Sequence, residues 1–422
     1  MFQLKLVFQK KKLGGNKMSL NSTPQSVRIH IGLFGKRNAG KSSVINAISN
    51  QDIAIVSDVA GTTTDTVFRP IEILPIGPCV LIDTAGLDDI GFLGELRVSK
   101  SLDILNKTDI ALIIVDSSLG ISNDDLELIN LLKNKKIPHI LVLNKIDKIK
   151  NKTKLIKSTK SQVQCPITCI SSITKEGIDK LKEIIIDNVD YENSNLKLVS
   201  DLIKEDDLIV LVIPIDKAAP KGRLILPQQQ VIRDILDNGA TAVITKETTL
   251  KETLSNLNKK PSLVITDSQV FQQISNDTPQ DILLTSFSIL FARQKGDLKE
   301  LVRGAKAIES LEDGDRILIA EGCTHHRQND DIGSFKIPNW LKNHTKKDLI
   351  FEYSSGITFT NDITKYKLII HCGACMMNRN AMLGRINKAK EYNVPIVNYG
   401  ILISYLNNIL DRTLEPFLFS HI

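Results

Sequence analysis

The sequence has no long apolar run, and it has little excess charge of either sign once its first residues are set aside. No stretch approaches the roughly 20 consecutive apolar residues that a membrane span needs, so we expect no membrane partner. The formal charge is +6, but residues 1–17 contain five lysines and no acidic residue. The remainder has 49 basic and 48 acidic residues, without the basic excess of nucleic-acid binders. We therefore expect no nucleic-acid partner either.

Cysteine is also scarce, with six residues in a chain of 422. The sequence lacks a secretory apolar segment followed by a small-residue cleavage site, so we expect a cytoplasmic protein whose cysteines stay reduced. Residues 1–26 are interpreted as a disordered leader. Their lysine-rich, acid-poor composition also resembles that of organellar transit peptides, although arginine is absent from them. Organellar targeting is therefore the alternative.

From Val27 onward, short apolar runs alternate with amphipathic stretches. The first such runs are Ile29–Phe34, Val80–Ile82, Ile110–Val115 and Ile140–Leu143. Strand–loop–helix repetition of this kind is typical of parallel βαβ units, so we predict an α/β fold. A polar stretch near residues 190–200 separates the first unit from the next. The predicted domains are residues 27–190, 200–288 and 289–422.

The strongest motif is Gly35–Ser42, which reads Gly-Lys-Arg-Asn-Ala-Gly-Lys-Ser between a predicted strand and a predicted helix. The Gly-x4-Gly-Lys-Ser pattern is typical of loops whose backbone N–H groups surround phosphates at a helix N-terminus. Lys41 is expected to neutralise the β- and γ-phosphates, and the Ser42 hydroxyl to bind Mg²⁺. The expected phosphate-binding residues are Gly35, Asn38, Ala39, Gly40, Lys41, Ser42 and Ser43.

Further motifs follow in the order that GTP-binding proteins require. The stretch Asp83-Thr84-Ala85-Gly86 ends an apolar strand, which places Asp83 to hold Mg²⁺ through a water and Gly86 to sense the γ-phosphate. The loop before it is expected to supply Thr62 and Thr63, with Thr63 on the metal. The residues expected to act directly in hydrolysis are Lys41, Thr63 and Gly86.

Recognition of the base is predicted for the stretch Asn144-Lys145-Ile146-Asp147, which follows another strand. The Asp147 carboxylate can accept two hydrogen bonds, from the N1–H and the N2 amine of guanine, which adenine does not offer. This pattern favours GTP over ATP. A second base-contacting loop is expected at Ser171 and Ser172. The expected base-binding residues are Asn144, Lys145, Asp147, Ser171 and Ser172.

Cysteine and histidine gather after two predicted strands near the C-terminus. Cys323-Thr324-His325-His326 follows one strand, and His371-Cys372-Gly373-Ala374-Cys375 ends the other. Functional loops of open parallel sheets lie beyond the carboxyl ends of strands. The candidate thiolate ligands are Cys323, Cys372 and Cys375, and the candidate fourth ligands are His325, His326 and His371. Such a set suits Zn²⁺ or an iron–sulfur cluster, and the spacing does not resolve which. The other three cysteines are expected to be ordinary core or surface thiols.

The N-terminal motifs resemble those of the Era and tRNA-modification GTPases. Leu87 follows the Asp-Thr-Ala-Gly motif where Ras-like enzymes carry a water-positioning glutamine, so the resemblance implies slow intrinsic hydrolysis. Asn38 matches the loop position that helps to bind potassium in such relatives, which implies stimulation by K⁺. Glu95 is a candidate for positioning water, with a solvated helix charge as its more ordinary role.

The whole arrangement, a P-loop GTPase followed by Cys-x-His and a distant His-Cys-x-x-Cys, resembles the FeFe-hydrogenase maturation GTPases. The resemblance runs from about Asn21 to the C-terminus and includes the stretches Lys217–Gln228 and Gly322–Gly333. It implies a GTPase domain, a dimerisation domain that forms a homodimer, and a cluster-binding domain. It also implies a 4Fe–4S cluster on the three cysteines named above, with a labile fourth position.

The same resemblance implies a scaffold function. The protein would receive a transient diiron subcluster made with two radical-SAM maturases, and would deliver it to apo FeFe-hydrogenase. GTP, Mg²⁺ and K⁺ complete the expected cofactors. Two alternatives stay open. One is a GTPase of tRNA modification or ribosome assembly with a structural zinc module, and the other is a redox-sensing GTPase whose cluster controls nucleotide turnover.

Overall fold

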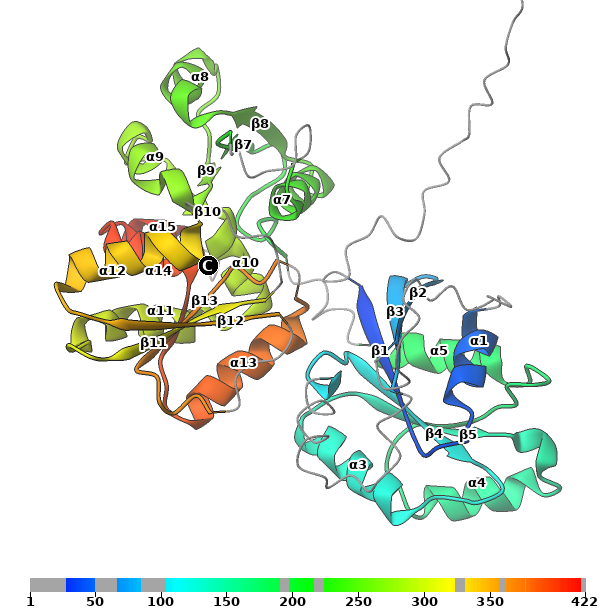
Figure 1. The fold of residues 1–422 in the computed structure, drawn as a ribbon. Coiled ribbons are helices and arrows are strands. Elements are labelled where there is room, and N and C mark those ends of the chain that lie inside the picture. Colours follow the sequence, from blue (N-terminus) through cyan, green and yellow to red (C-terminus); the bar gives the residue numbers. More distant parts are fainter. Residues whose placement is uncertain are drawn as a thin grey trace, which may run out of the picture.

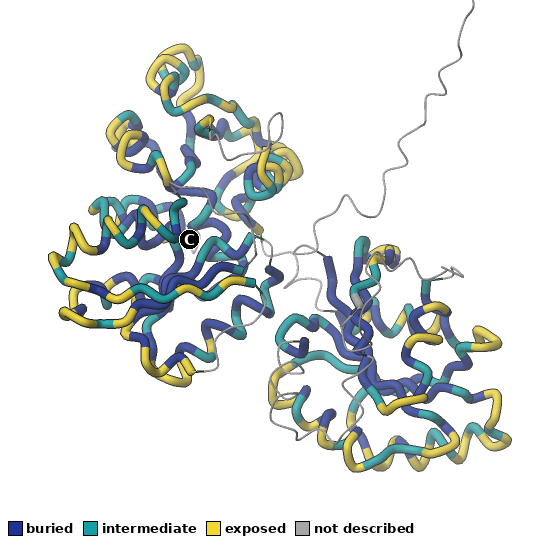
Figure 2. Tube along the Cα trace, in the orientation of Figure 1, coloured by how far each residue is buried: buried dark blue, intermediate teal, exposed yellow. Residues whose placement is uncertain are grey.

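The computed structural model describes residues 28–49, 67–84, 104–189, 197–215, 224–322, 331–356, 362–375 and 377–418. Within these ranges the chain forms three β-sheets with helices packed on them, which confirms the predicted α/β class (Figure 1). Buried residues follow the strands, and exposed residues lie on the outer turns of the helices (Figure 2). No helix in these ranges has both the length and the apolar character needed to cross a membrane.

The first sheet has six strands in the order β2-β3-β1-β4-β5-β6. The strands are β1 (Ile29–Phe34), β2 (Val67–Ile73), β3 (Gly77–Asp83), β4 (Ile110–Asp116), β5 (His139–Asn144) and β6 (Ile167–Cys169). Its helices are α1 (Lys41–Ser49), α3 (Asn123–Asn134), α4 (Lys152–Lys160) and α5 (Ile178–Asn188). Separate hydrophobic clusters fill its two faces, as expected for strands that are covered on both sides.

One strand of this sheet differs from the expected parallel pattern. β2 runs antiparallel to β3, while the other pairs in the sheet are parallel. The physical reason is the connection: residues Leu74–Ile76 form a short turn, whereas a parallel pair needs a crossover of a dozen or more residues. Pro70 lies in β2, which is an edge strand, where the missing N–H is tolerated.

The second and third sheets have four strands each, all parallel, in the orders β10-β9-β7-β8 and β12-β11-β13-β14. The second contains β7 (Leu208–Val212), β8 (Thr241–Thr245), β9 (Leu263–Thr266) and β10 (Leu283–Ser286), with α7 (Leu226–Asp237), α8 (Leu250–Asn256), α9 (Phe271–Asp277) and α10 (Phe287–Lys295). The third contains β11 (Arg316–Glu321), β12 (Ile350–Ser355), β13 (Leu368–His371) and β14 (Ile396–Asn398), with α11 (Leu298–Lys306), α12 (Ile337–Thr345), α13 (Arg379–Glu391), α14 (Tyr399–Leu406) and α15 (Leu410–Leu418).

These two sheets share one hydrophobic core, whereas the first sheet has cores of its own. Helix α15 follows the third sheet in the chain but packs on β10 of the second. The Thr285 hydroxyl donates to the carbonyl of Thr413 at 3.1 Å, and the Arg293 guanidinium lies 5.2 Å from the centre of the Phe417 ring. The second and third sheets therefore form one continuous packed body.

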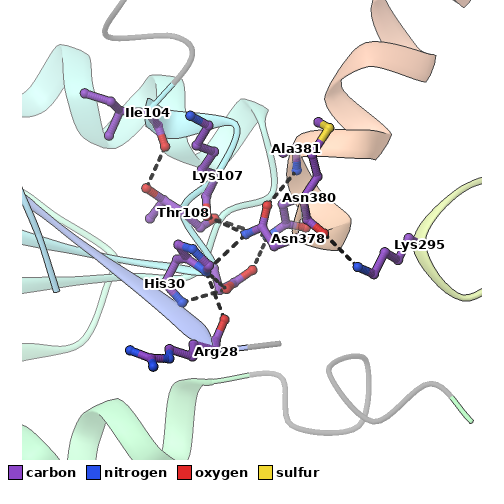
Figure 3. A network of polar contacts seen from close by, with 11 residues as sticks. Arg28, His30, Ile104, Lys107, Thr108, Lys295, Asn378, Asn380 and Ala381 are labelled. Carbon is purple, nitrogen blue, oxygen red and sulfur yellow. Dashed lines mark hydrogen bonds and ion pairs between the residues drawn. The ribbon is translucent and has the colours of Figure 1, made fainter. Parts of the chain in front are cut away.

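The N-terminal end of α13 connects this body to the first sheet (Figure 3). Asn378 caps the helix, since its Oδ1 accepts from the N–H of Ala381 at 3.1 Å. Its Nδ2 donates in the other direction, to the carbonyl of Lys107 at 2.7 Å. One side chain therefore fixes both the start of a helix and a contact between two sheet units.

Asn380 adds a second link on the same helix. Its Nδ2 donates to the carbonyl of Thr108 at 3.2 Å and to Asp109 Oδ1 at 2.7 Å. One turn further on, a Cβ added to Gly384 would lie 3.2 Å from Cγ of Asn106, so a small residue suits this close approach. The turn 106–109, which leads into β4, is thus held against α13.

Candidate functional site

The loop after β1 has the backbone shape that its glycines allow. Gly35 has φ +140°, and a Cβ there would lie 2.1 Å from the carbonyl oxygen of Ile114. Gly40 has φ +95°, and a Cβ there would lie 2.4 Å from Nδ2 of Asn144. Both the backbone angles and the lack of space therefore require glycine at these positions.

Lys41 begins α1 and is 6% exposed. Its ammonium donates to the carbonyls of Gly35 at 2.6 Å and Lys36 at 3.2 Å, so it lies across the mouth of the loop. The helix N-terminus adds a partial positive charge at the same place. A lysine ammonium and a helix N-terminus together make an anion-binding site of the size of a phosphate.

Ser42 and Asp83 lie together beside this loop. The Ser42 hydroxyl donates to Asp83 Oδ2 at 2.9 Å, and Asp83 ends β3 with 4% exposure. The pairing of β1 with β3, which aligns Leu33 with Asp83, brings them together from positions 41 residues apart. A carboxylate and a hydroxyl are oxygen ligands of the kind that Mg²⁺ prefers.

The expected base-recognition residues lie on the other side of the loop. Asn144 ends β5 and is fully buried; its Nδ2 donates to the carbonyl of Ala39 at 2.9 Å. Its Oδ1 accepts from the N–H of Ser172 at 3.2 Å. Asp147 is exposed in the short helical turn Ile146–Lys148. Asn144 thus ties the phosphate loop to the loop that follows β6.

Asp116 is a residue of this site that the sequence analysis missed. Lys145 Nζ donates to Asp116 Oδ2 at 2.7 Å and to the carbonyl of Asn38 at 2.5 Å. Burial opposes the charge of Asp116, but hydrogen bonds from Lys145 and Ser118 lower its pKa to about 2. Its only sequence signal is its position at the carboxyl end of β4. The pair holds Lys145 along the rim of the phosphate loop.

Several expected residues lie outside the described part of the chain. In the nucleotide site these are Thr62, Thr63, Gly86, Leu87 and Glu95, and in the cysteine site they are Cys323, His325 and His326. The roles expected for them therefore remain predictions.

The second site follows β13, where Cys372 and Cys375 carry free thiols in the turn after His371. Sγ of Cys372 accepts a hydrogen bond from the N–H of Gly322 at 3.1 Å. Gly322 directly precedes Cys323 and follows β11, the neighbour of β13 in the sheet. Gly322 and Cys372, each directly after its strand, therefore meet at the Cys372 thiol.

The donor set fits a thiolate-bound metal centre in its chemistry. Burial raises the pKa of the Cys372 thiol, while backbone N–H groups of Gly322 and Ala374 act in the opposite direction. Backbone N–H groups that point at sulfur are typical surroundings of iron–sulfur clusters, whose potential they tune. Within the described ranges, no group of three or more His, Cys, Asp or Glu side chains is placed to hold a metal ion. Two thiols are described here, and a third ligand would come from beyond Gly322.

His371, one of the candidate fourth ligands, makes other contacts in this structure. Its ring is fully buried, with Nδ1 2.8 Å from the carbonyl oxygen of Cys372 and Nε2 2.7 Å from Nη1 of Arg385. Burial, and then the charge of Arg385, lower the pKa of His371 to about 3. Both ring nitrogens have partners, so the structure offers no His371 nitrogen to a metal. The side chain instead links the cysteine turn to α13.

The remaining cysteines lie in the first sheet unit. Cys79 is fully buried, and burial raises its pKa to about 12. Cys165 and Cys169 are partly buried, and burial raises the pKa of each thiol. These environments suit ordinary packed thiols.

Comparison with known families identifies the class and then the family. Residues 30–145 match the family described as the 50S ribosome-binding GTPase, and this part of the chain is a P-loop GTPase domain that binds GTP. Residues 198–296 match the dimerization domain of hydrogen maturase F, and residues 299–416 match its tetramerization domain. The chain belongs to the hydrogen maturase F (HydF) family of hydrogenase maturation GTPases.

Curated relatives resemble mainly the GTPase part. A tRNA modification GTPase MnmE of Desulforamulus reducens is 39% identical over 158 residues, which are 37% of this chain and 34% of that protein. A GTPase Der of Lawsonia intracellularis is 37% identical over 170 residues, 38% of this chain and 37% of the relative. The chain thus spans about a third of the length of these relatives. The matched dimerization and tetramerization domains support self-association; the sequence predicts a homodimer and leaves open whether the assembly goes beyond a dimer.

Proposed function

We propose that the chain is a GTP-hydrolysing scaffold that holds a 4Fe–4S cluster on Cys323, Cys372 and Cys375 and delivers a diiron subcluster to apo FeFe-hydrogenase. The observation that carries the proposal is the hydrogen bond from the N–H of Gly322 to the Cys372 thiol. Gly322 directly precedes Cys323 in the chain, so this bond holds the residue next to Cys323 against the turn that carries Cys372 and Cys375. Membership in the maturase family supports the same reading. The diiron subcluster is the cargo, made with two radical-SAM maturases as further partners.

The cysteine turn supplies what such a resident cluster requires. Three thiolates leave one iron of a 4Fe–4S cluster open to an exchangeable ligand, which is the chemistry that the cluster contributes when bound. The chain's own part is to fix the thiols at the ends of β11 and β13 and to donate backbone N–H groups to sulfur. Arg385 and His371 keep the turn attached to α13.

The GTPase residues take the roles that P-loop chemistry assigns to their positions. Lys41 neutralises the phosphates, Ser42 and Asp83 hold Mg²⁺ with Thr63, and Asp147 accepts from guanine. Hydrolysis is slow because Leu87 cannot orient water, and K⁺ at Asn38 raises the rate. The carbonyl of Asn38 in the phosphate loop already faces a cation, because it accepts a hydrogen bond from the Lys145 ammonium.

The test is anaerobic reconstitution of the full chain with iron and sulfide, followed by metal analysis and EPR. We expect about four irons per chain and a reducible cluster signal, which Cys372→Ser abolishes while GTP hydrolysis is retained. Cys165→Ser, in the GTPase unit, is the matched control and should retain all the iron. One tightly bound zinc without iron uptake would overturn the proposal and favour a GTPase with a structural zinc module.

A second variant separates the two sites. Lys41→Ala is expected to load the cluster normally but to lose GTP hydrolysis and hydrogenase activation, because nucleotide ordering of the switch loops governs partner release. Full activation of apo-hydrogenase by Lys41→Ala would contradict the proposed role of GTP.

A further inference from the structure

Beneath the cysteine turn lies a buried ammonium. Lys295 ends α10 and is 5% exposed. Its Nζ donates to the carbonyls of Ala374 at 3.3 Å, Cys375 at 3.2 Å and Met377 at 2.9 Å. An ammonium has three N–H donors and a neutral amine has two, so three acceptors use the full capacity of the charged form. The geometry therefore describes a charged lysine held inside the turn.

This charge has no carboxylate partner among the described residues, since none lies within 4.0 Å of Nζ. The acidic residues at the start of α11 are engaged elsewhere: Glu300 binds Arg303, and the N-cap Asp297 faces Lys390. The Phe291 ring, 5.4 Å from Nζ, provides only a cation–π contact. Burying a charge without a counter-ion is strongly unfavourable.

Solvent can do little to screen the charge. The cavity between Lys295 and Cys372 has a volume of about 10 Å³, at the lower limit for a single water. The Lys295 ammonium contacts the cysteine turn directly, through the carbonyls of Ala374 and Cys375. The groups that can compensate the ammonium are thus the sulfur atoms of the turn that it supports.

We infer that Lys295 is a positioning residue for the cluster: it serves as the buried counter-ion of the thiolate-bound centre and fixes the turn that carries Cys372 and Cys375. This inference rests on the proposed function. A three-thiolate cluster carries net negative charge, and reduction adds one more electron. A nearby buried cation stabilises the reduced form more than the oxidised form, because the Coulomb energy grows with the charge. Lys295 lies at the end of α10 and contacts the carbonyl of Cys375, so it also joins the middle unit to the cluster turn. Figure 3 shows its side chain reaching toward the start of α13.

The experiment compares full-length wild type, Lys295→Met, Lys295→Arg and the control Lys299→Met, each reconstituted anaerobically with iron and sulfide. Methionine keeps the unbranched apolar stem and removes the charge, and Lys299 is an exposed lysine on the adjacent α11. The measurements are the midpoint potential from an EPR-monitored redox titration, the rate of iron loss to a chelator, and GTP hydrolysis as a check of folding.

We expect Lys295→Met to shift the midpoint potential to more negative values and to lose iron several-fold faster, with GTP hydrolysis unchanged. Lys299→Met should match wild type in all three measurements. A Lys295→Met chain with the wild-type potential and the wild-type rate of iron loss would overturn the inference.

Lys295→Arg decides the question if the methionine variant does not fold. Arginine keeps the charge, but its planar guanidinium cannot reproduce the three contacts of a compact ammonium. The expected result is a wild-type potential with faster iron loss, and a potential shifted to clearly more negative values would contradict the counter-ion role. If the wild-type chain takes up no iron, the proposed function and this inference are both contradicted. If the wild type takes up iron and Lys295→Met has the same potential and the same rate of iron loss, only the inference about Lys295 is contradicted.

Discussion

Gly40 shows how strongly one residue constrains the nucleotide site. Its φ is +95°, and a Cβ added there would lie 2.4 Å from Asn144 Nδ2, so both the backbone angle and the lack of space exclude a side chain. Gly77, the first residue of β3, has a similar φ of +83° but open space around it. Comparing alanine substitutions at these two positions therefore separates the cost of backbone strain from the cost of a steric clash.

We predict that Gly40→Ala lowers the affinity for GTP by more than about 10-fold, because relief of the clash must move Asn144 and the phosphate loop. Gly77→Ala should cost only about 1–2 kcal/mol of unfolding free energy, the penalty for a left-handed backbone, with affinity unchanged. Isothermal titration with GTP and urea unfolding measure the two effects. Equal affinities in both variants would show that the clash at Gly40 is relieved without consequence.

Asp116 predicts a dependence of stability on pH. Its pKa is about 2 in the folded chain and about 3.9 in an unfolded one. Since the folded value is the lower, the carboxylate stabilises the fold above about pH 4, and this contribution is lost as the pH falls toward 2.

We expect Asp116→Asn to lower the unfolding free energy of the GTPase unit by about 1 kcal/mol at neutral pH and to weaken the acid dependence. Urea unfolding between pH 6 and pH 3 provides the measurement. Asp187→Asn, an exposed residue at the end of α5, is the control and should behave as wild type. An Asp116→Asn chain with an unaltered acid profile would argue that the pair with Lys145 is not maintained in solution.

At the scale of elements, α13 carries contacts in two directions. Its N-terminal residues bind the turn 106–109 of the GTPase unit, and Arg385 binds His371 at the cysteine turn. The helix therefore contacts both the turn that leads into β4 and the cysteine turn.

We predict that Asn380→Ala loosens this junction while leaving the helix intact, because Asn378 and not Asn380 provides the cap. Hydrogen–deuterium exchange should rise several-fold in the turn 106–109 and in the first turn of α13. Asn387→Ala, on the exposed face of the same helix, is the matched control. Unchanged exchange in Asn380→Ala would mean that the two hydrogen bonds contribute nothing to the contact.

The sequence predicted most of the buried strands but missed the edge strands β2 and β12. β1, β4 and β5 are nearly continuous apolar runs and are recognisable as such. β12 alternates half-buried and exposed residues beside its partner β11, and β2 contains a proline, so neither has a clear strand pattern. Their structure depends on partners that are distant in the sequence.

The candidate site shows the same division. Motif residues such as Lys41, Ser42 and Asp83 could be predicted because their spacing is fixed by local loop geometry. Asp116 and Lys295 could not, because each acts through a side chain that meets its partners only in the folded chain. The contact between Arg385 and Nε2 of His371 could not be predicted for the same reason.

At the scale of the whole molecule, the cores predict two unfolding units. The GTPase sheet has its own hydrophobic clusters, while the other two sheets share one. Calorimetry of the full chain should therefore show two transitions. GTP with Mg²⁺ at 100 times its dissociation constant should stabilise only the first unit, by about 2.7 kcal/mol. The Lys41→Ala variant should lack that shift, and one merged transition that moves as a whole would contradict the division.

The position of α15 has a consequence for synthesis. Arg412 donates to the carbonyls of Ser275 and Thr278 near α9 and β10, and Phe417 belongs to the shared core. A growing chain can complete the GTPase sheet as soon as it emerges from the ribosome, but the face of β10 stays uncovered until residues 410–418 are made. The middle unit is thus among the last parts to finish folding. The nascent chain leaves the α15-binding face of β10 uncovered from residue 286 until α15 has been made.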